Sequence, residues 1–276
     1  MKFLPYLNPL SLARFLYQKR DLIRQLAWRS FTSRYKGSLL GFAWVVITPL
    51  ISLAVYTFAF GYIFRSRWSR NAGGSKLEFA ITVFCGLVPF TFFSDILSRS
   101  PTFIISAPNY VKKVVFPLEV ICPAEVLAGL GHTAIGFLIL ILSAALLLGQ
   151  FHWTLLLVPV GMLPLVMLAL GLSWLLAATG VFVRDVGPSV TLGLSLLMFL
   201  TPVFFDQNAA WIPLRVKRLL LLNPLATVLD TIRRAVLWDQ EPRWRNLIIV
   251  LIGSAVVMLV GFAGFMKSRK AFSDVI

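Results

Sequence analysis

The residues most often used for catalysis or metal binding are few in this sequence and lie far apart. His132 and His152 are the two histidines, and Cys85 and Cys122 are the two cysteines. None of them has the spacing of a metal site, and a GxSxG nucleophile elbow is absent. The sequence therefore predicts no catalytic residue and no metal ligands, which gives an interpretation as an enzyme little support.

A phosphate-binding loop is missing as well. The pattern GxxxxGK[ST] occurs nowhere, and GGSK at positions 73–76 lacks both the first glycine and the terminal Ser or Thr. The chain cannot bind and split a nucleotide by this device.

Charged residues beside apolar segments are the next candidates, because charge inside a membrane is costly and usually functional. Asp95 and Arg99 are four residues apart, so they can pair on one helix face. His132 lies within an apolar stretch, where we interpret it as a packed polar residue rather than a proton carrier. The remaining charges of this kind are Glu119, Glu125, Arg184 and Asp185. All lie near predicted membrane boundaries, which argues against an ion-coupled carrier.

The elements that position these residues are set by an apolar composition. Hydrophobic residues make up 58% of the 276-residue chain and charged residues only 13%, about half the charged share of a soluble domain. The net charge of +15 would suggest nucleic acid in a soluble protein. Here the basic residues mark loops and helix ends, so we expect membrane lipids and no nucleic acid as partners.

Six stretches are long and apolar enough, or nearly so, to cross a membrane as helices. They are 39–64, 79–97, 120–148, 155–183, 189–205 and 247–266. The fifth is short, and Pro202 would bend or stop it. With both termini inside, the cytoplasmic side holds a modest majority of the 26 Lys and Arg residues. We therefore predict an all-α integral membrane protein of one domain, residues 1–276.

A basic segment, 10–36, precedes the first predicted span. Leu22, Ile23, Leu26, Ala27, Phe31 and Tyr35 recur at helical spacing, and Arg24, Gln25, Arg29, Ser33 and Lys36 occupy the other side. This is an amphipathic helix suited to the cytoplasmic headgroup plane, and Gly37 offers a break after it. It is either an anchor that fixes topology or also a docking surface.

The segment 209–240 follows the fifth predicted span and is both apolar and basic. Its two apolar parts, 216–222 and 225–238, are divided by Asn223 and Pro224. Proline disfavours helix at the residue before it and can begin a new one. Neither part is long enough to span, so we expect two short helices that lie at the interface or re-enter the membrane.

Four blocks of the sequence resemble the ABC-type polysaccharide export permeases of the ABC type-2 superfamily. They are LAWRSFTSRYKGSLLGFAWVVITPL (26–50), APNYVKKVVFPLEVICPAEVL (107–127), VFVRDVG (181–187) and NPLATVLDTIRRAVL (223–237). The blocks occur in the order of that family, and the resemblance extends over nearly the whole chain.

This resemblance implies a six-span subunit that acts as a homodimer with two copies of a separate nucleotide-binding subunit. ATP and Mg would be bound by that partner, and no cofactor by this chain. The cargo implied is a lipid-linked glycan, namely O-antigen, capsule or teichoic acid. The implied location is the bacterial cytoplasmic (inner) membrane, with both termini cytoplasmic.

The resemblance also assigns roles to residues on the cytoplasmic side and on the outer side of the membrane. The ATPase subunit would contact the basic helix and the loop after the second span, at Arg24, Arg29, Asn109, Lys112, Lys113, Phe116, Pro117 and Glu119. An outer gate would include Trp211, Asn223, Pro224, Arg233 and Arg234.

Two further groups of residues would contact the glycolipid. Arg34, Tyr35 and Lys36 would guide its pyrophosphate headgroup, with simple membrane anchoring as the alternative. Aromatic faces stack on sugars, so the expected channel lining is Trp44, Tyr56, Phe60, Phe199, Phe204 and Phe205. For any single ring, however, a lipid-facing or packing role is the favoured interpretation. Two alternatives stay open for the whole chain: an exporter of a drug or small lipid, and a membrane-bound glycosyl- or acyltransferase.

Overall fold

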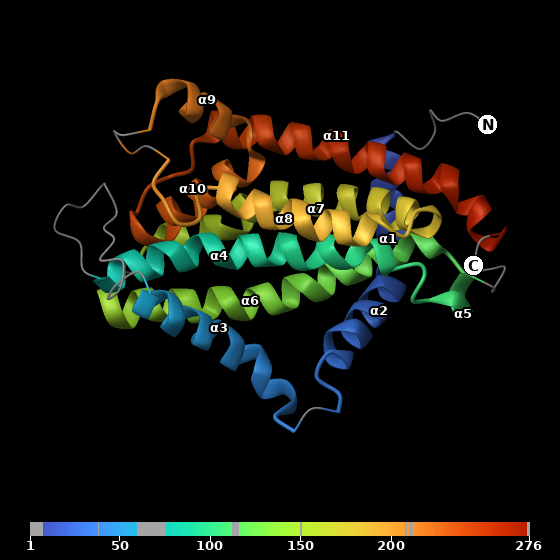
Figure 1. The fold of residues 1–276 in the computed structure, drawn as a ribbon, viewed down its shortest axis with the longest axis horizontal. Coiled ribbons are helices and arrows are strands. Elements are labelled where there is room, and N and C mark those ends of the chain that lie inside the picture. Colours follow the sequence, from blue (N-terminus) through green and yellow to red (C-terminus); the bar gives the residue numbers. More distant parts are fainter. Residues whose placement is uncertain are drawn as a thin grey trace.

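Helices form most of the described structure (Figure 1). The computed structural model describes residues 8–37, 39–59, 76–111, 116–149, 151–207, 209 and 212–274. No strand occurs within these ranges, so the predicted all-α class is confirmed.

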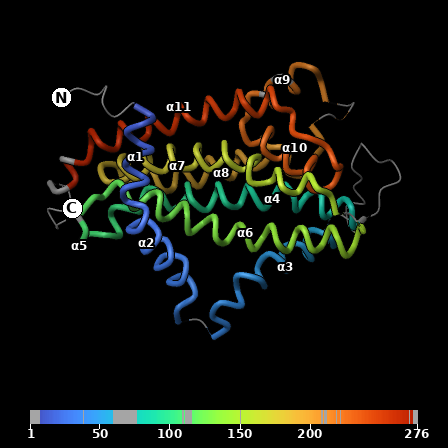
Figure 2. Tube along the Cα trace, turned by 180° about the vertical axis from the view of Figure 1, so that it is seen from behind, coloured from blue at the N-terminus to red at the C-terminus, as the bar shows by residue number. Residues whose placement is uncertain are grey.

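Five helices lie lengthwise beside one another and form a bundle, as both views show (Figure 1, Figure 2). They are α4 (Lys76–Arg99), α6 (Ile121–Leu148), α7 (Val158–Phe182), α8 (Val186–Leu200) and α11 (Trp244–Ser268). Short 3-10 turns extend four of them, at Ser100–Thr102, Leu118–Val120, Trp153–Leu157 and Arg269–Asp274. Trp174 of α7 and Phe265 of α11 are fully buried in the core.

The closest helix pair in the bundle is α7 with α11, which meet at two glycines. A Cβ atom on Gly261 would overlap the carbonyl oxygen of Gly171, and one on Gly171 would lie 2.6 Å from the Cα atom of Met258. Because neither residue carries a side chain, the two backbones come into direct contact. Small residues allow this kind of packing in membranes, where apolar burial against lipid gives helices no drive to associate.

Within the described residues, five helical segments are long and apolar enough to cross a membrane. They are Gly41–Ala59, Leu77–Thr102, Leu118–Leu148, Trp153–Phe182 and Trp244–Ser268. The stretch predicted as the fifth of six spans forms only α8, which has 15 residues and rises about 22 Å, short of the ~30 Å hydrocarbon core. It ends because Thr201 is extended, as the residue before a proline prefers to be.

The basic N-terminal segment consists of two helices rather than one. α1 (Pro9–Gln18) and α2 (Arg20–Ser33) are separated at Lys19. The apolar face of α2 buries Ile23, Ala27 and Phe31, which form one cluster with side chains of α6 and of the turn before it. The helical spacing in the sequence predicted this apolar face of α2. The face packs against α6, however, and not against lipid alone.

The chain reverses after α2 and enters α3 (Trp44–Tyr56) through the 3-10 turn Gly41–Ala43. In both views α2 and α3 diverge from the bundle and form a V (Figure 1, Figure 2). Val45 is the buried residue of α3, and only 6% of the apolar window in this segment is buried. The face of α3 is therefore open to lipid or to another protein.

Two short helices follow α8 and differ in their surroundings. α9 (Leu214–Leu222) is largely exposed, whereas α10 (Pro224–Leu237) is buried over nearly its whole length. They divide at the predicted Asn223–Pro224 junction, where the Asn223 side chain accepts a hydrogen bond from the Leu225 amide at 3.0 Å and caps α10. Surrounding protein thus covers the short helix α10.

The contact between α7 and α11 leads to a stability prediction. Gly261→Ala places a methyl group against the Gly171 backbone, so we expect about 1–3 kcal/mol of destabilisation from overpacking. Gly253→Ala on the same helix is the matched control, because a Cβ atom there meets nothing within 4 Å. Thermal unfolding of both variants in detergent measures the difference. Equal melting temperatures would contradict the proposed backbone contact.

Candidate functional site

A cavity of about 310 Å³ lies where the end of α2 meets α3, α4 and α6. Beside aliphatic residues such as Leu87 and Val88, its lining contains two kinds of side chain that can bind a ligand. Charged or polar groups come from Arg34, Tyr35, Thr48, Ser52, Thr91, Asp95, His132 and Thr133, and aromatic rings come from Trp44, Tyr56, Phe84 and Phe92. A site of this composition can bind an anionic group beside rings that stack on an organic ligand.

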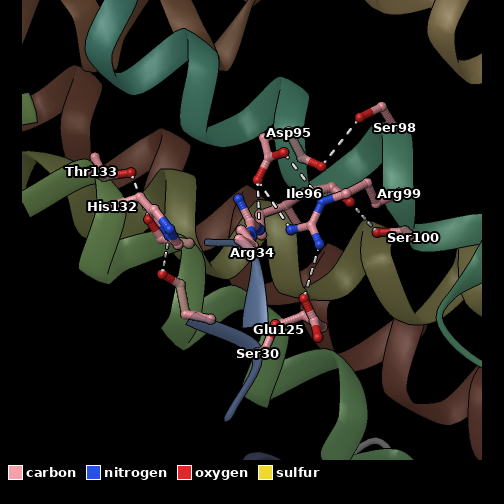
Figure 3. A network of polar contacts seen from close by, with 12 residues as sticks. Ser30, Arg34, Asp95, Ile96, Ser98, Arg99, Ser100, Glu125, His132 and Thr133 are labelled. Carbon is pink, nitrogen blue, oxygen red and sulfur yellow. Dashed lines mark hydrogen bonds and ion pairs between the residues drawn. The ribbon is translucent and has the colours of Figure 1, made fainter. Parts of the chain in front are cut away.

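An ion-pair network forms the charged side of the cavity (Figure 3). Nη2 of Arg34 lies 3.0 Å from Oδ2 of Asp95. Arg99 donates from Nε and Nη2 to the two oxygens of Asp95 at 3.2 and 3.1 Å. Arg99 also donates from Nη1 to Oε2 of Glu125 at 3.1 Å. The predicted Asp95–Arg99 pair is confirmed, and the network joins the turn after α2 to α4 and α6.

An aromatic cluster holds Tyr35 and His132 at the edge of the cavity. The ring centroid of His132 lies 4.4 Å from that of Phe31 and 5.5 Å from that of Tyr35. Nδ1 of His132 is 2.9 Å from the Ala128 carbonyl of its own helix, in keeping with the predicted packed polar role. Burial raises the pKa of Tyr35, so its phenol remains a neutral hydrogen-bond donor.

The cavity brings together residues that the sequence assigned to two separate groups. Arg34 and Tyr35 were expected at the headgroup, and Trp44 and Tyr56 in the channel, yet all four line one space. Lys36 is exposed and does not line it.

The other expected channel residues lie near α8. The ring of Phe204 is 5.8 Å from that of Tyr56, Phe199 is 75% exposed on α8, and Phe205 is partly buried. Phe60 lies outside the described residues.

The expected ATPase contacts fall on α2 and on α5 (Pro108–Val111). Nη1 of Arg29 donates to the hydroxyl of Tyr110 at 3.0 Å, and Tyr110 stacks on Phe116 at 4.3 Å. Tyr110 therefore ties the two expected contact regions together, although its type and position gave no signal in the sequence. Arg24 is exposed on α2, Asn109 belongs to α5, and Lys112 and Lys113 lie outside the described residues.

Glu119, also expected at this contact, turns its carboxylate inward. The side chain is 5% exposed, and Nη1 of Arg269 donates to both of its oxygens at 3.0 and 2.8 Å. Nε1 of Trp174 donates to its backbone carbonyl at 3.1 Å. Through this ion pair, Glu119 holds the C-terminal turn Arg269–Asp274 against the 3-10 turn before α6. Glu119 lies two positions after Pro117, another of the expected contact residues.

Residues expected at the outer gate connect α10 to the chain after α8. Arg233 is 3% exposed and donates from Nη1 and Nη2 to the carbonyls of Pro202 and Val203, both at 2.7 Å. Its Nε donates to the Thr82 carbonyl at 3.1 Å. Its guanidinium fits against α4 because Gly86 has no Cβ, which would lie 2.7 Å from Nη2.

Neighbouring residues add to this connection. Asn223, next to Pro224, donates from Nδ2 to Oγ1 of Thr201 at 3.0 Å. Arg234 donates from Nε to the Glu241 carbonyl at 2.8 Å. Trp211 lies outside the described residues.

Comparison with known proteins identifies the family. A family model described as ABC-2 type transporter matches residues 21–237, a range that includes the cavity, the ion-pair network and helices α9 and α10. The chain belongs to the ABC-2 type transporter family. Together with its apolar helices, this membership makes it a multi-pass transmembrane permease.

Similar proteins cover almost the full length of this ABC-2 type transporter. An O-antigen export system permease protein RfbA from Myxococcus xanthus is 28% identical over 263 residues, which cover 95% of this chain and 97% of the relative. A protein of the same name from Klebsiella pneumoniae is 24% identical over 258 residues, covering 93% and 95%. The resemblance inferred from the sequence is confirmed.

The three hydrogen bonds of Arg233 lead to a second stability prediction. Lysine cannot reproduce the planar fork of donors, so Arg233→Lys leaves buried carbonyls unpaired, and we expect a loss of about 2 kcal/mol. Arg234→Lys is the control, because its hydrogen bond to the Glu241 carbonyl lies at an exposed position and we expect a change below about 0.5 kcal/mol. Thermal unfolding in detergent compares them. Similar losses in both variants would show that the Arg233 bonds contribute nothing specific.

Proposed function

We propose that this protein is the membrane subunit of an ATP-driven exporter that moves lipid-linked O-antigen polysaccharide across the bacterial cytoplasmic membrane. The observation that carries the proposal is the cavity between α2, α3, α4 and α6, which places the Arg34 guanidinium beside the rings of Tyr35 and Trp44. The near full-length similarity to O-antigen export permeases supports it.

The cavity has the chemistry that the headgroup of such a cargo requires. A guanidinium binds phosphate through two parallel hydrogen bonds, and Tyr35 offers a neutral donor beside it. Trp44 lies at the start of α3, where a sugar next to the pyrophosphate would meet its ring. Lys36, exposed at the same turn, would attract the anionic headgroup from the membrane surface.

The exposed helices support a channel between two copies of the chain. The apolar faces of α3 and α8 are open, with Leu192, Leu196 and Phe199 of α8 all more than half exposed. We propose that two protomers meet along these faces and that Tyr56 and Phe204 line the path between them. In this arrangement α8 and residues 201–205 together act as a sixth, short span.

The energy would come from two copies of a nucleotide-binding subunit that hold ATP and Mg. Both α1 and the last turns of α11 lie at the α5 end of the bundle (Figure 2), where Phe15 contacts Phe262 at 5.8 Å. We assign this end to the cytoplasm. The Arg29–Tyr110 hydrogen bond would pass movement at α5 to α2, and the Arg34–Asp95 pair would pass it to α4.

The headgroup role of Arg34 can be tested through the ATPase activity of the assembled exporter. Arg34→Ala removes a charge-assisted contact to phosphate, so we expect lipid-linked glycan to stimulate ATPase activity about ten-fold less well. Arg20→Ala, on the exposed side of α2, should retain stimulation. The activity is measured in nanodiscs with the nucleotide-binding subunit present. Normal stimulation in a correctly assembled Arg34→Ala variant would overturn the assignment.

The docking role of the chain after α5 can be tested by charge reversal. We expect Lys112→Glu combined with Lys113→Glu to abolish co-purification of the nucleotide-binding subunit, since two attractive charges become repulsive. The control reverses Arg215 and Lys217 of α9, at the opposite end of the bundle. Retention of the partner by the first double variant would contradict docking there, and its loss from the control would indicate general misfolding.

A further inference from the structure

The acidic partner of Arg34 lies within the candidate headgroup cavity. Nη2 of Arg34 is 3.0 Å from Oδ2 of Asp95, and both side chains line the cavity. Among the described residues this is the only ion pair of Arg34. The group best suited to bind a phosphate is therefore already bound to a carboxylate of the same chain (Figure 3).

Asp95 has a second basic partner besides Arg34. Arg99 sits one turn further along α4 and reaches both Asp95 oxygens, at 3.2 and 3.1 Å. Arg99 in turn contacts Glu125 at 3.1 Å. When Arg34 separates from Asp95, Asp95 keeps its two hydrogen bonds from Arg99, although the Asp95–Arg99–Glu125 cluster then carries one uncompensated negative charge.

The Arg34–Asp95 pair is also accessible to a competitor. The side chains of Arg34 and Asp95 are 25% and 40% exposed, and ion pairs at this exposure contribute little net stability. A pyrophosphate carries more negative charge than a carboxylate and can take two parallel bonds from one guanidinium. Pyrophosphate is therefore a stronger partner for Arg34 than a carboxylate that Arg99 already shares.

We infer that Asp95 is an internal competitor for the Arg34 site, so that the Arg34–Asp95 pair and a bound pyrophosphate headgroup exclude each other. The inference rests on the proposed function, because it takes a lipid pyrophosphate as the ligand. Headgroup binding then releases the turn after α2 from α4 and leaves the Asp95–Arg99–Glu125 cluster intact. Loading of cargo is thereby linked to the position of α2, the helix that also contacts α5.

Competition of this kind lowers the apparent affinity for the pyrophosphate headgroup. The headgroup can bind only to the fraction of molecules in which Arg34 is released from Asp95. Asp95→Asn removes the competing charge, so we expect polyprenyl pyrophosphate to bind about three- to five-fold more tightly than to the wild type. Binding is measured by titration of the purified protein in nanodiscs of neutral phosphatidylcholine. Asp95→Ser removes the same charge with a smaller side chain and serves if the first variant does not assemble.

A matched variant separates competition from a general effect of charge. Glu125→Gln removes one negative charge from the same network, but Glu125 contacts Arg99 and not Arg34, so its effect should be less than half that of Asp95→Asn. In an Arg34→Ala background Asp95→Asn should give no gain. An equal gain in Glu125→Gln, or an undiminished gain without Arg34, would overturn the inference.

Comparing variants and ligands distinguishes a failure of this inference from a failure of the proposed function. Wild-type binding of polyprenyl pyrophosphate that depends on Arg34, with no gain in Asp95→Asn, refutes only the competition. Binding that Arg34→Ala leaves unchanged refutes the headgroup site itself. Inorganic pyrophosphate and nanodiscs with phosphatidylglycerol are tested in parallel. Equal Arg34-dependent binding of either would show that the site takes any phosphate and would overturn the assignment to a pyrophosphate-bearing lipid.

Discussion

Within a bilayer, a charge or a backbone carbonyl has no water to bind, so the protein itself must supply every partner. The described structure meets this constraint with three polar clusters near the ends of the bundle. Arg34, Asp95, Arg99 and Glu125 form the first, and Glu119 with Arg269 forms the second. Arg233 and the carbonyls of Pro202 and Val203 form the third. Between them the helices pack through apolar and small side chains.

The three clusters lie at different places in the bundle, and each is associated with a different part of the proposed transport cycle or of the fold. The first cluster faces the candidate headgroup cavity, and the second fixes the start of α6 beside the proposed ATPase contact. The third holds the short helix α10 against the end of α8. The α7–α11 pair, joined at Gly171 and Gly261, gives a rigid frame. Against this frame, α3 buries only Val45 among its residues, so few buried contacts restrain its position.

The sequence predicted what local patterns encode. Helical period identified the buried face of α2, apolar length identified five spans, and four-residue spacing identified the Asp95–Arg99 pair. It could not predict partners that are distant in the chain, such as Arg34 with Asp95 or Glu119 with Arg269, because any of several acidic residues satisfied the same pattern. It also did not show where the helix in the fifth predicted span ends. Apolar composition continues through Phe204, while the geometry before Pro202 ends the helix at Leu200.

The central claim, that the cavity beside α2 binds a pyrophosphate headgroup through Arg34, is tested most directly by a structure of the exporter with its lipid-linked glycan. The decisive quantity is the distance from the Arg34 guanidinium to the nearest phosphate oxygen. We predict about 2.8 Å, with Asp95 no longer within contact of Arg34. A headgroup bound elsewhere, with the 3.0 Å Arg34–Asp95 pair unchanged, would contradict the account.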